Sequence, residues 1–425
     1  MNRYSGIGAL AKIAFRNIWR NKRRTAFCLS SVGISVFFFV VFSSMQDGIM
    51  KNMNSTVQIF ETGHVKVVSA QYEAENESMP VQYPLGSSAS RPGKSWKELS
   101  AEISLIPGVH SVFPRINSIA TLQESTMKHA ILWGLDIEGE RKAHYFNIAR
   151  RNDGLAEGRW PEPDSNECAV GHIFAKKTGL SIGDRIPLKT VSAQFSDRLW
   201  SPVITGIFNF DFFRYDESVI ITGFQRLARL LTLDEGTQQL VIFADDENQS
   251  TSITAAAQYI LGEDSVVSDW KDNYWIAIQK TNDVIYLAVF LIALVIACFL
   301  IINTVVMIIQ ERIKEIGMMG SLGMTRLEIV TVFFFESIFL AAIGALCGVI
   351  IGGMLTGIMS RFPIRLIDMY KNSLSVMPAS NTVFFQFSFQ KIMGAWIIGV
   401  VMASVFTIIP SLKSAFIEPV EALRR

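Results

Sequence analysis

Residues 311–353 read ERIKEIGMMGSLGMTRLEIVTVFFFESIFLAAIGALCGVIIGG, and this stretch decides the fold. A block that carries Glu311, Arg312, Lys314 and Glu315 is followed by a glycine-rich turn and then by a long apolar run. A run of this length is sufficient for a helix to cross a membrane. The charged block before it therefore predicts a short loop at one face of the membrane.

Charged residues are also missing from other long stretches. No Asp, Glu, Lys or Arg occurs at residues 25–46, 284–310, 337–360 or 392–412. Each stretch reaches the roughly 20 residues that a membrane-spanning helix needs. The composition agrees, since 50% of the residues are hydrophobic, 18% are charged and the mean hydropathy is +0.31. The sequence predicts four transmembrane helices, which we place at residues 25–46, 284–310, 329–360 and 392–412.

Lysine and arginine in the segments between the predicted helices give the orientation, because cytoplasmic loops retain an excess of both. Basic residues crowd segment 1–24, where they line one side of a predicted amphipathic helix, and they recur in the loop 311–328 and in the tail 413–425. These three segments are therefore expected in the cytoplasm, although the short outer loop 361–391 is basic as well. The apolar run at 25–46 is too long for a cleavable signal and predicts an uncleaved anchor.

The remaining segment, residues 47–283, predicts a large mixed α/β domain outside the cytoplasm. Short β-rich stretches at 64–68, 109–113 and 218–221 alternate with turn signals and helical patterns. The polar stretch from Tyr72 to Ser95 suggests a flexible excursion from this domain or a mobile hairpin.

The outer domain shows little sign of catalytic chemistry. Cys168 is its single cysteine, since Cys28, Cys298 and Cys347 fall in predicted spans; it is either a reactive thiol or a small buried apolar residue. The histidines have no metal-ligand spacing, and no metal is expected: His64, His110, His129, His144 and His172. The segment RPGKS at 91–95 lacks the glycine that a phosphate-binding loop requires at position 88, so no ATPase site is predicted on this chain.

Two features of the third predicted span could matter for mechanism. Gly344, Gly348 and Gly352 repeat every fourth residue, which allows close approach of another helix, in the same chain or in a second one. Glu336 lies in an apolar setting, where a carboxylate is costly unless it is paired, solvated or protonated. It is a functional candidate, and the alternative is a residue near the membrane interface that caps a neighbouring helix.

The whole block at 311–353 resembles the signature of the FtsX-like and MacB-like ABC transporter permeases. In that family an ERxxEIG block, an LG turn, an acidic residue in the next span and a glycine-rich helix follow one another. Both ends of the chain are similar to the same family, through LAKIAFRNIWRNKRRT at 10–25 and PSLKSAFIEPVEALRR at 410–425. In the outer domain GHVKVVSA, IPGVHSVFPRI and AVGHIFAKKTGLSIGDRIPL are similar to lipoprotein-releasing (LolC/LolE-type) permeases, in order along the chain.

The resemblance implies a permease subunit in the bacterial inner membrane, with a MacB-like periplasmic core domain inserted between spans 1 and 2. Its implied partners are a dimer of a separate cytosolic ABC ATPase, which uses the ATP, a second permease copy or paralogue, the exported substrate and membrane lipids; no nucleic acid is implied, and no cofactor is bound directly. The coupling helix on the ATPase would be formed by Glu311, Arg312, Lys314, Glu315, Ile316, Gly317, Leu322 and Gly323. Taken by itself, the local pattern of this block favours a solvated helix end whose ion pairs contribute only about a few tenths of a kcal/mol.

The function implied is mechanotransmission, in which ATP-driven movement of the spans reaches the periplasmic domain and releases lipoproteins from the membrane. One alternative is export of a peptide, drug or other small molecule with an outer-membrane partner. A second is regulation of a cell-wall hydrolase without transport. An enzyme acting alone finds no support, because no nucleophile, metal cluster or pair of carboxylates is arranged for catalysis in the sequence.

Overall fold

The computed structural model describes residues 3–19, 22–74, 79–86, 94–122, 129–143, 154–233, 235–274, 276–278, 324–362, 364–365 and 382–415, with single positions between 281 and 318. The chain forms two compact units. One, the membrane unit, contains residues 1–49, 281–364 and 383–425. The other, the outer domain, contains residues 50–280 together with 365–382.

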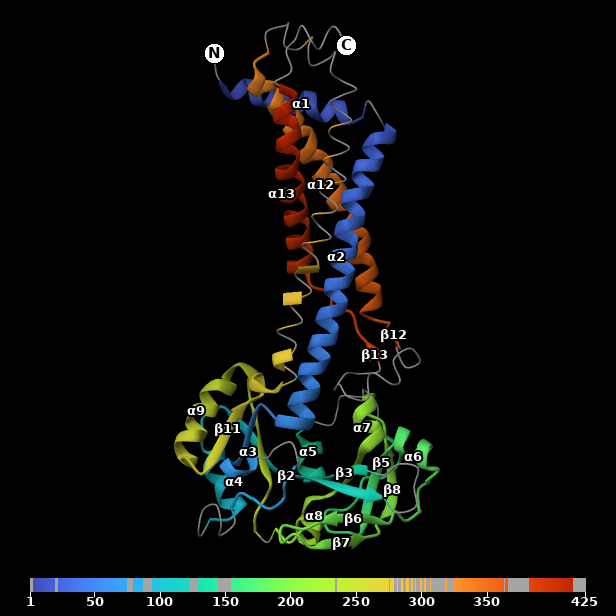
Figure 1. The fold of residues 1–425 in the computed structure, drawn as a ribbon, viewed down its shortest axis with the longest axis vertical. Coiled ribbons are helices and arrows are strands. Elements are labelled where there is room, and N and C mark those ends of the chain that lie inside the picture. Colours follow the sequence, from blue (N-terminus) through green and yellow to red (C-terminus); the bar gives the residue numbers. More distant parts are fainter. Residues whose placement is uncertain are drawn as a thin grey trace. The chain divides into compact units, whose positions relative to one another are not determined.

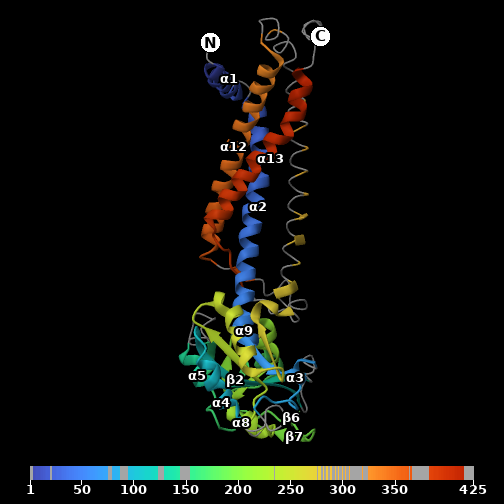
Figure 2. The same cartoon turned by 90° about the vertical axis from the view of Figure 1, so that its left-hand side faces the viewer.

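The membrane unit consists of long helices. They are α1 (Arg3–Ile18), α2 (Lys22–Thr56), α12 (Arg326–Met359) and α13 (Phe389–Ala415). In both views α12 and α13 lie beside the part of α2 that belongs to this unit (Figures 1 and 2). Within the residues that the structure describes, three helical segments are long and apolar enough to span a membrane, at Thr25–Thr62, Leu327–Met359 and Phe389–Phe406. The predicted span at 284–310 lies outside the described residues, apart from single positions.

Helix α2 continues well past Gln46, where its charge-free run ends. It remains α-helical to Thr56 and then widens into a π-helix, η1 (Val57–Thr62). The backbone hydrogen bonds of a helix do not require apolar side chains, so loss of apolar character does not by itself end the helix. The end comes at Gly63, whose φ of +64° turns the chain into the first strand, since glycine adopts a positive φ without steric cost.

The outer domain alternates strands and short helices, as the sequence predicts. Its strands are β1 (Val65–Ser69), β2 (Val109–Leu122), β3 (His129–Leu135), β4 (Leu155–Gly158), β5 (Glu167–Gly171), β6 (Leu188–Val191), β7 (Asp197–Trp200), β8 (Val203–Phe208), β9 (Val219–Gly223), β10 (Gln239–Ala244) and β11 (Ser265–Asp269). Its helices are α3 (Ala70–Ala74), α4 (Trp96–Ser104), α5 (Ile137–Lys142), α6 (His172–Thr178), α7 (Phe213–Ser218), α8 (Phe224–Leu230), α9 (Ser250–Leu261) and the 3₁₀ turns η4 (Glu247–Gln249) and η5 (Trp270–Asp272). Two further strands of two residues each, β12 (Ile364–Arg365) and β13 (Thr382–Val383), pair with each other in a separate sheet.

One mixed sheet organises this domain. Its strands follow the order β11-β1-β10-β2-β3-β9-β5-β8-β4, and the hairpin β6–β7 attaches to the far end of β2. The pairs β3–β9 and β5–β8 are parallel, and the other pairs are antiparallel. Segments predicted as strands at 64–68, 109–113 and 218–221 are confirmed as parts of β1, β2 and β9.

Side chains from the central strands fill a core on each face of the sheet. Neighbouring residues of a strand point to opposite faces. Accordingly Leu132 and Ile220 join one buried cluster with Phe174 of α6 and Leu227 of α8. Trp133 joins another cluster, which is rich in aromatic rings and contains Phe60 of η1. A third cluster packs α4 and α9 on β1 and β10.

The prediction of a flexible excursion from Tyr72 to Ser95 is wrong for the residues that the structure describes. Tyr72, Val81 and Leu85 are buried, and Leu85 bonds with Thr237 through both backbone groups. Ser95 closes the stretch as the N-cap of α4 and forms a capping box with Glu98. Apolar residues scattered among polar ones gave too weak a pattern to reveal this anchoring.

Candidate functional site

The predicted coupling block lies outside the described residues. This holds for all eight of its proposed contact residues, from Glu311 to Gly323. The residues directly after the block are described. Thr325 caps α12, accepting a hydrogen bond from the backbone N–H of Glu328 and donating its own N–H to the Glu328 carboxylate. The sequence TRLE at 325–328 therefore fixes where α12 begins.

The repeated glycines of α12 lie against α2. A Cβ at Gly348 would overlap the carbonyl oxygen of Gly33, and one at Gly344 would lie 2.9 Å from the carbonyl oxygen of Leu29. At Gly352 it would lie 3.2 Å from Cβ of Val40. The two helices therefore touch backbone to backbone, within one chain. Sequence reasoning missed Gly33, the partner on α2, because a single glycine in an apolar run carries no periodic signal.

We call the contact of Gly33 on α2 with Gly344 and Gly348 on α12 the glycine seam. Apolar side chains flank it. Val32, Val36 and Val40 of α2 pack with Ala345 and Val349 of α12. Helix α13 joins them through Ile392 and Ala395. The indole N–H of Trp396 donates to the backbone carbonyl of Ala342 at 3.2 Å. The seam thus holds three helices together with almost no polar side chain.

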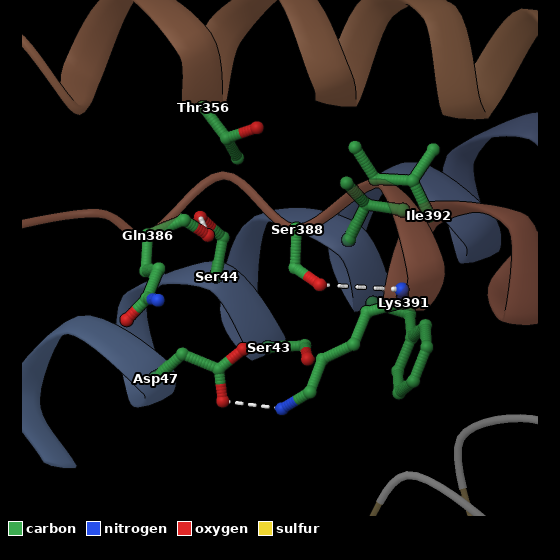
Figure 3. A pocket seen from close by; sticks show the side chains of 10 residues that line it. Ser43, Ser44, Asp47, Thr356, Gln386, Ser388, Lys391 and Ile392 are labelled. Carbon is green, nitrogen blue, oxygen red and sulfur yellow. Dashed lines mark hydrogen bonds and ion pairs between the residues drawn. The ribbon is translucent and has the colours of Figure 1, made fainter. Parts of the chain in front are cut away.

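A polar pocket lies near residue 47 of α2 (Figure 3). The strap that precedes α13, residues 384–388, forms one wall and is bonded to Ser44. The Ser44 hydroxyl donates to the Gln386 carbonyl at 2.8 Å, and the Gln386 N–H donates to the Ser44 carbonyl at 3.0 Å. Lys391 and Asp47 point toward each other and form an ion pair. Nothing in the sequence distinguished these residues.

Gly48 determines how closely the strap can approach. A Cβ at this position would overlap the carbonyl oxygen of Phe384. Thr356 on the opposite wall bonds to its own helix at the Gly353 carbonyl. The two bonds between Ser44 and the Gln386 backbone therefore fasten the strap to α2.

Glu336 is buried in α12, with 6% of its surface exposed. It lies one helical turn before Leu340, which packs with Ile18 from α1. Phe15 of α1 contacts Phe339 edge to face, with ring centroids 5.6 Å apart. The carboxylate therefore belongs to the packed segment of α12 that receives α1, and its role as a functional candidate stays a prediction.

Cys168, His64 and His110 of the outer domain take part in structural contacts. Burial raises the pKa of the Cys168 thiol, which is fully enclosed in β5 and therefore protonated at neutral pH. His64 Nδ1 accepts a hydrogen bond from the Ala244 N–H, and His110 pairs with Asp245. Among the described residues no group of three His, Cys, Asp or Glu side chains is arranged to hold a metal.

Known proteins resemble the chain in both of its parts. The model of the MacB-like periplasmic core domain matches residues 25–260, more than half of the chain, and that of the FtsX-like permease C-terminal region matches 287–419. The lipoprotein-releasing system transmembrane protein LolC of Xylella fastidiosa (strain Temecula1) is 21% identical over 354 residues, covering 80% of this chain and 83% of that protein.

Two further relatives match over different lengths. LolC of Neisseria meningitidis serogroup B is 20% identical over 346 residues, 77% of this chain and 81% of its own. The macrolide export ATP-binding/permease protein MacB of Nitrobacter winogradskyi is 24% identical over 211 residues, 49% of this chain and 28% of its own. The chain is therefore a multi-pass membrane protein of the FtsX-like ABC transporter permeases, with a MacB-like periplasmic core domain.

Proposed function

We propose that this permease transmits the work of a separate cytosolic ATPase to its periplasmic domain, and that this movement releases lipoproteins from the cytoplasmic membrane. The observation that carries the proposal is the continuity of α2. One helix contains the predicted first span and ends, through η1, at the first strand of the periplasmic sheet. A continuous helix passes on displacement along its length, whereas a flexible linker would absorb it.

The extent of similarity favours lipoprotein release over export. The LolC relatives align over about four fifths of this chain and of their own length. The MacB relative aligns over 28% of its length, since it carries ATP-binding and permease functions in one protein by its name. An ABC transporter permease implies a partner ATPase subunit. We place the ATPase contact at Glu311, Arg312, Lys314, Glu315, Ile316, Gly317, Leu322 and Gly323, with both chain termini in the cytoplasm and a second permease copy or paralogue beside this one.

Release can be tested with purified components. The permease and its native ATPase are reconstituted in liposomes together with a labelled lipoprotein, and the label in the supernatant is measured. We expect release with ATP and none with a non-hydrolysable analogue. Retention of the lipoprotein under ATP hydrolysis, with movement of a peptide or drug across the same liposomes, would replace this proposal by the export alternative.

The ATPase contact has its own test. Reversing two acidic charges, Glu311→Lys with Glu315→Lys, should abolish co-purification of the ATPase, because charged pairs set the register of such an interface. Glu263→Lys, at an exposed position of the periplasmic domain, is the matched control and should leave the complex intact. Equal recovery of the ATPase with both variants would contradict the assignment.

A further inference from the structure

The π-helix η1, which continues α2, is surrounded by other elements of the periplasmic domain. Consecutive residues of η1 contact different elements. Val57 packs with Trp270 and Ile276, and the Gln58 amide donates to the Glu247 carboxylate at 3.0 Å. A helix lying on a surface would use one face only. We call this surrounding set of contacts the socket.

Phe60 and Glu61 complete the socket. The ring of Phe60 lies among aromatic side chains, with centroid distances of 4.7 Å to Phe210 and 5.0 Å to Tyr215. The Tyr215 hydroxyl donates to the Glu61 carboxylate at 2.9 Å. Glu61 also receives the amide of Asn273 at 3.4 Å. Apolar packing and hydrogen bonds therefore alternate along the same turn.

Arg115 of β2 binds Ile59, between Gln58 and Phe60. Its Nη2 donates to the Ile59 carbonyl oxygen at 2.7 Å. The same guanidinium grips Glu140 of α5 with two bonds, from Nε at 2.9 Å and from Nη2 at 2.7 Å. Both side chains are almost completely buried, at 3% and 1% exposure. The buried guanidinium of this pair therefore binds a single backbone carbonyl of η1.

The chemistry of a helix end explains why a cation is placed there. The last carbonyls of a helix have no partner within the helix and carry a partial negative charge. An arginine supplies both a donor and a compensating positive charge. Glu140 fixes the guanidinium in one orientation, since two parallel bonds leave it no freedom to rotate. Arg115 is therefore a rigid cap for the helix that comes from the membrane unit.

We propose that the Arg115–Glu140 pair is the positioning element that locks the end of α2 to the periplasmic domain, so that displacement of the first span moves this domain as one body. The inference rests on the proposed function for its consequence, which is substrate release. The lock itself is independent of the substrate. A π-helical turn at this point agrees with such a role, because π-turns inside long helices are frequent at functional positions.

The experiment compares two variants in the full permease–ATPase complex. Arg115→Met removes the cap but leaves Glu140 buried without its partner, which threatens folding. Arg115→Met with Glu140→Met removes both charges and leaves an apolar pair of similar size, which restores stability without restoring the donor to Ile59. Lys142→Met breaks the exposed pair with Glu138 on the same helix and is the matched control.

Rigidity is measured directly between spin labels at Lys51→Cys, exposed on α2, and Tyr259→Cys, which is 91% exposed on α9. Both positions belong to the same compact unit. The other cysteines are replaced by alanine, apart from the buried Cys168. We expect one narrow distance distribution in the parent protein and in Lys142→Met, with either nucleotide, and a broadened one in the double variant. ATP hydrolysis should persist in the double variant while lipoprotein release is lost.

The outcomes separate the two proposals. If the double variant is stable and also recovers the narrow distribution and release, the pair serves stability only and the lock is overturned. A broadened distribution with undiminished release would overturn it as well. If the parent protein releases no lipoprotein but shows the narrow distribution that the double variant loses, the proposed function fails and the lock stands.

Discussion

Helix α2 is held in two opposite ways at its two ends. In the membrane unit its contact with α12 depends on the absence of side chains at Gly33, Gly344 and Gly348. In the periplasmic domain its continuation η1 is surrounded by large polar and aromatic side chains, among them Arg115 and Tyr215. The two regions show how the surroundings of a helix decide what fastens it.

The difference follows from the solvent around each region. Lipid tails are as apolar as leucine, so burial gives membrane helices little drive to associate, and close backbone packing takes its place. In the aqueous domain, burial of aromatic rings is favourable, and a buried ion pair can be supported by further hydrogen bonds. The stability of the glycine seam should therefore depend on side-chain volume. The stability of the periplasmic core around the socket should depend on charge and pH.

The largest expected effect is a pH dependence in the loop beside the socket. Asp216 of α7 is fully buried, and burial raises its pKa to about 8, although the N–H groups of Phe210 at 2.8 Å and Phe212 at 3.2 Å favour its charged form. A carboxyl whose pKa is raised on folding stabilises the fold below its unfolded pKa, near 4, and loses this contribution as the pH rises through about 8. Each pKa unit corresponds to about 1.4 kcal/mol, so the total reaches a few kcal/mol.

Hydrogen exchange at the amides of Phe210 and Phe212, corrected for intrinsic rates, measures this effect in the full chain. Protection should fall between about pH 4 and about pH 8 in the parent protein. Asp216→Asn cannot ionise and should show a flatter dependence. The amides of α12 around Gly348 are the internal reference, because the glycine seam contains no titrating side chain. If protection fell equally at Phe210 and Phe212 and around Gly348, the pH dependence would not be specific to the periplasmic loop, and the contrast between the two regions would be wrong.

A single methyl group should break the seam. Gly348→Ala places its Cβ on the Gly33 carbonyl, and overpacking of this kind costs about 1–3 kcal/mol. Gly394→Ala on α13 is the matched control, since nothing lies within 4 Å of a Cβ there. Resistance of the full chain to unfolding by SDS should fall for Gly348→Ala and stay or rise for Gly394→Ala. Equal resistance would mean that the helices can separate slightly without loss.

Much of this contrast was hidden from the sequence, for reasons that differ between the regions. The glycine repeat of α12 is local and periodic, so it predicted a helix contact, but its partner Gly33 lies 311 residues before Gly344 and has no repeat of its own. The strands at 64–68, 109–113 and 218–221 were predictable because β-rich runs between turns are local signals.

The socket could not be predicted, because its members become neighbours only after folding. Arg115 lies in the middle of a strand, within the stretch IPGVHSVFPRI, and Glu140 lies on a six-residue helix, 25 positions later; nothing in the sequence pairs the two. Ile59 contributes a backbone carbonyl, which no sequence pattern marks. The end of α2 was likewise missed. The predicted span ends with the charge-free run at Gln46, whereas the backbone of α2 stays helical to Thr56. The ATPase contact at Glu311 to Gly323 stays a prediction.

A smaller effect is expected where one polar bond of the socket is removed. Tyr215→Phe keeps the aromatic packing with Phe60 but deprives Glu61 of a hydrogen bond. A bond to a charged group is worth about 1.5 kcal/mol or somewhat more. Tyr259→Phe, at a position 91% exposed, is the control and should change nothing. Chemical unfolding followed by tryptophan fluorescence checks the difference. Identical midpoints would show that Glu61 is satisfied without the tyrosine by Asn273 and by Arg214, whose Nη1 lies 3.8 Å from the Glu61 carboxylate.

The smallest effect is expected from the ion pair in the membrane unit. Lys391 and Asp47 have side-chain exposures of 54% and 21%, so solvent screens their attraction, and such pairs contribute at most about 1 kcal/mol. Lys391→Met should therefore lower resistance to SDS only slightly, whereas Gly48→Ala, in the same fastening, should lower it strongly because its Cβ would overlap the Phe384 carbonyl. This ranking tests the comparison within one fastening. If Lys391→Met lowered the resistance to SDS more than Gly48→Ala, polar bonding and not close backbone packing would hold the strap to α2.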